Sequence, residues 1–224
     1  MDKREQVGVS EVFGYILVFV MVSFLLSVIY LQAMPQLKSQ EDYANFKVME
    51  DNLMVLRDYI GLVAFNVTPS KVVSLNVNKG VVYLTPIATV NISTKTKNYN
   101  YTISGLAYEI GNSRIYILCG AVVECFGNSC IVISDPPFTK DCIRLINLSG
   151  YLAFSGPHSL TLTNANVTVL KVDWINFTFE DTALAQAWND SLSKIGLNAH
   201  LENNEKSVNV TFNGLLTYHE VNVS

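Results

Sequence analysis

Residues 12–34, VFGYILVFVMVSFLLSVIYLQAM, form the stretch that decides the fold of this chain. The stretch has 23 residues and no charged side chain, and a helix of about 20 apolar residues is long enough to cross a bilayer. Three roles fit it: a signal peptide that is removed, a membrane anchor, or a surface with which the protein works. The run is longer than the ~7–15 residues of a signal-peptide core, which argues against removal after Ala33.

The polar segment before this stretch, residues 1–11, carries Lys3 and Arg4 close to the apolar run. Basic residues beside a membrane span favour the cytoplasmic side, so we expect this segment inside and the rest of the chain outside. Lys38 and Lys47 lie on the other side of the run and weaken the asymmetry.

A second helical pattern follows Pro35. Its apolar side chains recur at alternating spacings of three and four residues, which is typical of a helix with one apolar stripe. The stripe consists of Phe46, Met49, Leu53, Leu56, Ile60 and Val63. We therefore predict that segment 35–66 is an amphipathic helix that continues the first, with its stripe packed on the chain's own head. Pro35 has no backbone N–H to donate and is expected to bend or loosen the junction.

After residue 66 the apolar pattern changes to period two, which is typical of strands. Turn residues rich in Gly and Asn divide the strands, and they predict hairpins over 71–84, 88–105, 106–118 and 121–134, the first with its turn at Asn78 to Gly80. Further strands are predicted over 143–154, 159–163 and 166–179, and again in the last residues on both sides of a turn at Asn203 and Asn204.

One helix interrupts the strands. Asp181 or Thr182 is its predicted cap, Gly196 its predicted end, and its apolar face consists of Leu184, Trp188, Leu192 and Ile195. We expect Trp174 and Trp188 in the core. The predicted fold class is α+β: a long N-terminal helix, followed by a β-rich globular head over residues 67–224 with one or two short helices.

The composition excludes several classes of function. Among the 224 residues only 15% are charged and the net charge is −4, so without a basic block nucleic acid is not an expected partner. His158, His200 and His219 lie far apart, and no short metal-binding spacing, nucleophile motif or phosphate-binding glycine loop occurs. We expect no enzyme activity, no catalytic residue, no cofactor and no bound metal.

Nine Asn-x-Ser/Thr sequons lie after the apolar stretch, and chance would give about two or three. Their asparagines are Asn66, Asn91, Asn100, Asn147, Asn166, Asn176, Asn189, Asn209 and Asn222. The excess favours an exported surface protein with N-linked glycans. The alternative is a strand surface rich in Asn and Thr that carries no sugar.

Four cysteines, Cys119, Cys125, Cys130 and Cys142, fall within 24 residues. Three disulfide pairings are possible, and in an exported chain disulfides are favoured over a zinc site. Cys125 and Cys130 flank a four-residue hairpin loop, where opposed strand residues bring Cα atoms close enough for a disulfide. We therefore favour Cys125–Cys130, which leaves Cys119–Cys142.

The stretch GVSEVFGYIL, residues 8–17, resembles the N-terminal signature of archaeal type IV pilin-like proteins: a short basic leader, a small polar motif with an acidic residue, then an apolar helix. Parts of the body, RIYILCGAVVEC and SDPPF followed by a late helix with a tryptophan, are also similar to an uncharacterised archaeal family of single-helix surface proteins. The pilin resemblance covers about residues 3–34, and the amphipathic helix and β-rich head agree with the general pilin plan.

This resemblance implies that a class III signal peptidase cuts before the apolar helix, so that the helix is kept. Glu11 would be the fifth mature residue if the cut fell between Gln6 and Val7, and in pilins an acidic residue there helps to dock the incoming subunit. The chain departs from the pattern at Gln6, where a small residue is usual. The alternative is that Glu11 marks the head-group region of the membrane.

The function that the resemblance implies is structural. The chain would polymerise into a surface filament for attachment, stored in the membrane and assembled by the pilus machinery. The expected assembly residues are Glu11, Phe13, Tyr15, Leu17, Phe19, Phe24 and Tyr30. Three rivals remain: a monomeric membrane-anchored binding protein, a minor pilin of a filament or export platform, and an anchored surface enzyme.

Overall fold

The computed structural model describes the backbone of residues 3–202 and 205–224, with side chains from Val12 onward in these ranges. The chain forms two units, Met1–Ala44 and Asn45–Ser224. Helix α1 (Lys3–Ala64) makes up the first unit and contributes its last turns to the second, which also holds the sheet. The boundary between the units therefore lies inside the predicted segment 35–66. The predicted turn at Asn203 and Asn204 lies outside the described residues.

Helix α1 confirms the long N-terminal helix, and it continues through Pro35 over 62 residues. Its end is set by side-chain hydrogen bonds from a distant strand. The Nδ2 of Asn164 donates to the carbonyl oxygens of Val63 at 3.0 Å and of Ala64 at 3.2 Å, among the last carbonyls of the helix. Asn66 then adopts a positive φ of 59°, so the backbone leaves the helix.

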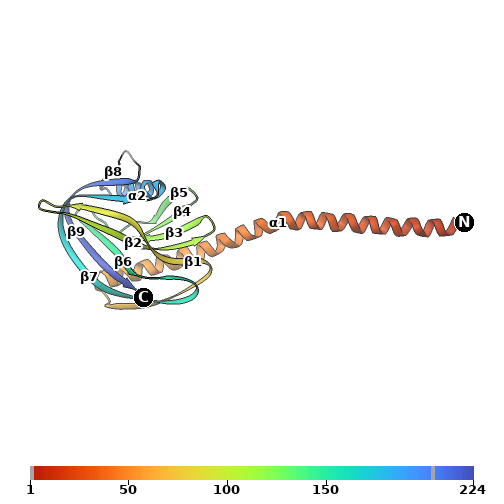
Figure 1. Cartoon of the computed structure of the whole chain (residues 1–224), viewed down its shortest axis with the longest axis horizontal. Helices are drawn as coiled ribbons and strands as arrows, with labels where there is room; N and C mark the ends of the chain where they lie inside the picture. The colour runs from red at the N-terminus through yellow and green to blue at the C-terminus, as the bar shows by residue number, and fades with distance from the viewer. Residues whose placement is uncertain (1–2, 203–204) are drawn as a thin grey trace. The chain divides into compact units, whose positions relative to one another are not determined.

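The described part of the head contains one nine-stranded sheet (Figure 1). The strands are β1 (Ser70–Ser93), β2 (Asn98–Ile110), β3 (Ser113–Leu118), β4 (Ala121–Phe126), β5 (Ser129–Ser134), β6 (Cys142–Gly150), β7 (Ala153–Phe179), β8 (Asn198–Leu201) and β9 (Ser207–Val223). Their order in the sheet is β5-β4-β3-β2-β1-β7-β9-β6, and β8 pairs with β9. With α1 and the short helix α2 (Thr182–Lys194), these strands confirm the α+β class.

The predicted turns between β1 and β5 are confirmed at three of four places, between β1 and β2, β2 and β3, and β4 and β5. The turn predicted at Asn78 to Gly80 instead lies inside β1, which is a single strand. Its pairing with β7 breaks between Val77 and Val82, and Gly80 has a φ of 89° within that break. The glycine that suggested a hairpin therefore marks an irregularity within a long strand.

Strand β7 also joins two predicted strands, because the chain continues through a bulge between Asn164 and Asn166. The predicted strand 143–154 in turn ends earlier, with β6 stopping at Gly150. These long strands pair with partners far away in the sequence, so local turn signals do not set their ends.

Helix α2 was placed correctly by its sequence signals. The side chain of Asp181 caps it by accepting from the backbone N–H of Ala183 at 2.8 Å, and Gly196 follows its end with a φ of 83°. The helix lies beside β8 and β5 (Figure 1). Trp188 is fully buried there, but Trp174 is 39% exposed, so the expectation of a core position for Trp174 is wrong. A bulge between Val172 and Trp174 turns its indole to the outer face of the sheet.

The curl of the sheet brings β6 against β2, although the two strands are not neighbours in the sheet order. The buried Asn147 of β6 makes the link: its Oδ1 accepts from the backbone N–H of Ser104 at 2.8 Å. Its side chain also bonds the hydroxyl of Tyr218, whose ring stacks on Tyr101 with centroids 4.5 Å apart. The amide thus replaces a strand-to-strand hydrogen bond where the sheet folds over on itself.

Gly120 gives the first test of this packing. Its φ is 80°, and a Cβ there would lie 2.9 Å from Cδ of Pro137. Gly111 has a φ of 59° and open space around it, so it is a matched control. We expect Gly120→Ala to lower the free energy of unfolding by about 2–3 kcal/mol and Gly111→Ala by about 1 kcal/mol. Denaturant unfolding of the purified chain measures both, and equal losses would contradict the close packing at Gly120.

Candidate functional site

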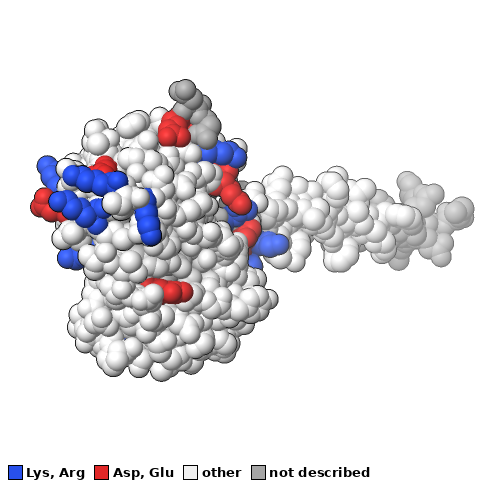
Figure 2. All heavy atoms as spheres, turned by 60° about the vertical axis from the view of Figure 1, so that its left-hand side comes forward, with Lys and Arg blue, Asp and Glu red and all other residues white. Residues whose placement is uncertain are grey.

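The apolar stretch of α1 presents its side chains to the surroundings. Within residues 12–34 none is buried in the structure, and Figure 2 shows the described part of this stretch without charged atoms. The expected assembly residues have exposed fractions between 57% and 76%: Phe13, Tyr15, Leu17, Phe19, Phe24 and Tyr30. The side chain of Glu11 lies outside the described residues. The structure thus leaves a long apolar surface without cover.

Among the described residues, α1 is the one helix long and apolar enough to cross a membrane, and its apolar window is not buried. An apolar N-terminal helix of this kind indicates membrane anchoring or a signal. It is apolar on all sides over residues 12–34, as expected for a helix surrounded by lipid or by other apolar helices.

The last turns of α1 behave differently, because their stripe is buried in the head. The six predicted residues are between 0% and 3% exposed: Phe46, Met49, Leu53, Leu56, Ile60 and Val63. They share one hydrophobic core with side chains from β1, β2, β3, β4, β6, β7 and β9. Each such burial contributes about 1.5–3 kcal/mol, so this part of the helix belongs to the head. The predicted packing of the stripe is confirmed.

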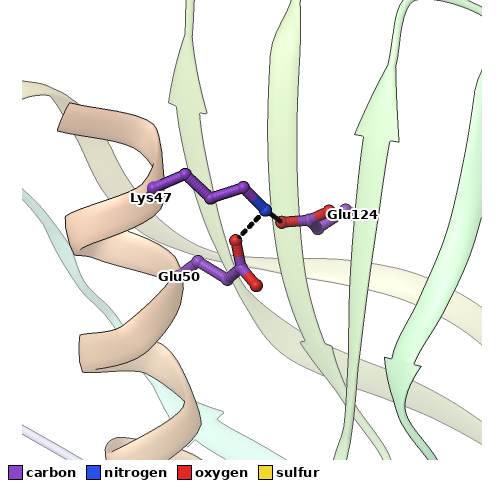
Figure 3. A network of polar contacts seen from close by, with 3 residues as sticks. All are labelled: Lys47, Glu50 and Glu124. Atoms are coloured by element: carbon purple, nitrogen blue, oxygen red, sulfur yellow. Dashed lines mark hydrogen bonds and ion pairs between the residues drawn. The ribbon is translucent and has the colours of Figure 1, made fainter. Parts of the chain in front are cut away.

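A polar network lies at the start of this contact (Figure 3). The Nζ of Lys47 donates to Oε1 of Glu124 on β4 at 3.0 Å and also pairs with Glu50 one turn along the helix. Glu124 is 5% exposed, whereas the side chain of Lys47 is 41% exposed. The lysine therefore bridges a buried carboxylate and a half-covered one across the contact between helix and sheet.

The two carboxyl groups of this network differ in acidity. Burial, with a hydrogen bond to Glu50, raises the pKa of Glu124 above its ordinary value. Burial acts in the same sense on Glu50, but hydrogen bonds with Glu124 and Lys47 outweigh it and lower the pKa of Glu50. Hydrogen bonds to Glu50 and Glu124 raise the pKa of Lys47. Glu124 is thus the group of the pair that takes up a proton first as the pH falls.

Arg57 makes a second polar link further along α1. Its Nε donates to the carbonyl oxygen of Gly120 at 2.7 Å, one Nη to that of Asp135 at 3.0 Å, and the other Nη to Oδ1 of Asp58 at 2.8 Å. The carboxylate of Asp135 also accepts from the hydroxyl of Ser191 on α2 at 2.9 Å. One guanidinium thus joins α1, the turn between β3 and β4, and the segment that holds α2.

A hollow of about 410 Å³ lies beside Arg57, lined by apolar side chains such as Leu62, Phe65 and Ile146. The guanidinium of Arg57 is the cation at its wall, and the three hydrogen bonds above already orient it. Among the described residues no group of three or more His, Cys, Asp or Glu is placed to hold a metal ion.

The cysteines form one disulfide in the structure. Cys125 and Cys130 lie opposite each other on β4 and β5 and are bonded, as predicted, with Cα atoms 4.1 Å apart. Cys119 and Cys142 are free thiols, so the predicted Cys119–Cys142 bond is wrong. The thiol of Cys119 lies at the backbone of Ile146, four residues along β6 from Cys142. That is about 13 Å of strand, beyond the span of a disulfide, and burial raises the pKa of Cys119 to about 12.

The nine sequon asparagines differ in exposure. Asn66, Asn100, Asn166 and Asn222 are exposed, while Asn91, Asn189 and Asn209 are half-buried. Asn147 and Asn176 are buried, at 8% and 9% exposure, and their side chains are held in hydrogen bonds. The folded chain cannot present these two to a glycosyltransferase, which leaves seven candidate glycan sites.

Sequence reasoning did not identify Arg57 or Glu124 as important, because their partners come from elements 63 and 77 residues away in the chain. For Glu124 one signal was present: it is a charged residue within the apolar strand AVVECF. A buried charge at such a position requires a partner of opposite charge, and Lys47 supplies it.

Residues 8–224 match the model of a family described as a family of unknown function, DUF7289, and the chain belongs to it. No curated protein and no solved structure matches the chain.

The network at Glu124 can be tested by removing its cation. Lys47→Met should lower the free energy of unfolding by about 1–2 kcal/mol at pH 7, because it leaves the buried carboxylate uncompensated. The loss should shrink as the pH falls, since the raised pKa of Glu124 lets this group take up a proton and become neutral. Lys38→Met is the control, an exposed lysine of the same helix. Urea titrations at several pH values measure both, and a loss that grows toward acid would contradict this account.

Proposed function

We propose that this DUF7289 member is a structural subunit of an archaeal type IV pilus-like surface filament that serves in attachment. Its subunits associate without covalent chemistry through the apolar stretch of α1, residues 12–34. Before assembly the same stretch anchors the chain in the membrane, with a class III signal peptidase and a pilus assembly machinery as its partners. The proposal includes no catalytic step.

The observation that carries the proposal is the division of α1 into two parts with opposite surroundings. Its last turns are buried in the head, whereas its apolar stretch has no cover within the structure. Once such a surface leaves lipid it has to be buried, because exposed apolar area costs about 25 cal/mol per Å². The same stretch of neighbouring copies supplies a surface of the right character.

The exposed sequons agree with a surface location. Asn66, Asn166 and Asn222 are the best candidates for N-linked glycans, since their side chains lie at the surface of the head. Glycans at these positions would cover head surface and leave the apolar stretch free, because no sequon lies within residues 12–34.

A second candidate function is a monomeric, membrane-anchored extracellular binding protein. It is favoured by the same exposed helix, since a stretch of 23 apolar residues can stay in the bilayer as a simple anchor. A minor pilin of a filament or export platform would share every feature of the major subunit and differ in abundance.

Assembly separates these candidates. Sheared surface fractions of cells that make this chain should show filaments by electron microscopy, labelled by an antibody against the head. Glu11→Ala should abolish the filaments and leave the amount of membrane-bound chain unchanged, because Glu11 would act only in docking. Asp51→Ala is the matched control, an exposed acid on the same helix, and it should assemble normally. Dispersed wild-type monomer in detergent-solubilised membranes, with no filaments, would defeat the proposal.

A further inference from the structure

The outer face of the sheet carries a regular array of amide and hydroxyl side chains at the end next to β8. Residues that pair directly across β2, β1, β7, β9 and β8 lie on the same face and form rows. In strand order, the first row is Asn98, Ser93, Trp174, Thr211 and Asn198, and the second is Asn100, Asn91, Asn176, Asn209 and His200. The third is Thr102, Thr89, Thr178 and Ser207, with Glu202 bonded beside Ser207. We call these three rows the polar grid.

The alternation of each strand shows that the polar grid faces outward. Between its members lie the buried side chains of Ile92, Phe177 and Val210, which belong to the core under α2. Apolar residues therefore occupy one face of the five strands and polar residues the other. The first row is mostly exposed. The second and third rows are exposed at Asn100, His200 and Thr102, and they are covered at Asn176 and Ser207.

This alternation also explains part of the sequon excess. Four of the nine sequons begin in the second row, at Asn91, Asn100, Asn176 and Asn209. In each the residue two positions on is a Ser or Thr of a flanking row. Neighbouring strands are about 4.8 Å apart, so four adjacent asparagines cannot each carry a glycan. What these four asparagines share is their position on the outer face of the sheet.

The polar grid is ordered before any ligand arrives. The Nδ2 groups of Asn176 and Asn209 donate to Oε1 of Glu202 at 2.9 and 3.4 Å. The hydroxyl of Thr178 donates to Oδ1 of Asn176 at 3.1 Å and lies 3.2 Å from that of Ser207. These bonds fix the amides at the centre of the grid, so little conformational entropy is lost in ordering them when a ligand binds.

We propose that the polar grid binds a neutral polysaccharide in extended form. Carboxamides and hydroxyls both donate and accept, as sugar hydroxyls do, and the half-exposed indole of Trp174 offers a flat apolar surface to the C–H face of a sugar ring. Within each row, side chains on neighbouring strands repeat at about 4.8 Å, close to the length of one sugar residue in an extended chain. The site does not depend on filament formation, and in a filament it would give the attachment function a ligand.

The near absence of charge in the polar grid favours a neutral ligand over a charged one. The grid contains no Lys or Arg and one carboxylate, that of Glu202, whose oxygen the amides already occupy. The grid therefore offers no Lys or Arg to pair with an anionic polymer. For a cationic polymer it offers a single carboxylate, which is already hydrogen-bonded. A second protein copy is disfavoured, because the centres of protein interfaces are rich in apolar and aromatic side chains and the polar grid has one indole.

The experiment measures binding of the full-length chain, in detergent micelles and made in a host without N-glycosylation, to solid polysaccharides. The neutral probes are cellulose, chitin and amylose, and the charged probes are alginate and chitosan. Trp174→Ala, Thr89→Ala and Asn91→Ala alter the polar grid, and the first two leave every sequon intact. Tyr151→Ala, a 94% exposed aromatic, and Asn112→Ala, an exposed turn residue, are the matched controls. Thermal unfolding of each variant confirms that it is folded.

We expect the wild-type chain to bind at least one neutral polysaccharide, with binding unchanged in high salt. Trp174→Ala should weaken this binding about tenfold, a loss of roughly 1.4 kcal/mol. Thr89→Ala and Asn91→Ala should weaken it measurably, and both controls should bind as the wild type does. No binding to any neutral probe, binding to alginate or chitosan alone, or equal binding by grid and control variants would overturn it. Self-association through the grid that excludes the polysaccharide would overturn it as well.

Discussion

The structure depends on the burial of one helical stripe, Phe46 to Val63, in the core of a sheet that follows it in the sequence. The stripe supplies an apolar layer that seven strands share, so the sheet folds around its own N-terminal helix. The polar links follow from this placement. Lys47 can reach the buried Glu124, and Arg57 the turn at Gly120, only because the stripe fixes the rotation of the helix between them. Asn164 then holds the last carbonyls of the helix, and the chain turns into β1.

The elements that the sequence predicted well are those with local causes. The stripe shows its spacing of three and four, the short hairpins show Gly and Asn at their turns, and α2 shows a cap at Asp181. The elements that it missed are decided by distant partners. Gly80 looked like a hairpin turn and lies within β1, and β7 crosses a bulge at Asn164 because β9 continues beside it. No local pattern reveals which strand will pair with which.

The candidate sites show the same division. Cys125 and Cys130 pair because they are neighbours across one tight hairpin, whereas the fate of Cys119 and Cys142 depends on where β6 lies. The sequons were visible in the sequence, but the register that aligns four of them across four strands was not. That register places the four asparagines side by side on one surface. It supports the alternative that part of the sequon excess reflects a strand surface rich in Asn and Thr. Trp174 was expected in the core, but a single bulge places it on the exposed face, and a bulge carries no sequence signal of its own.

The functional account requires that the chain keep its apolar stretch, since the same helix anchors the head core and presents the surface for assembly. N-terminal sequencing of the surface-exposed protein tests this requirement most directly. The account predicts a start at Val7, so that the mature chain begins just before the apolar helix and carries it whole. A start at Met34 would show that the stretch is a discarded signal and would contradict the account.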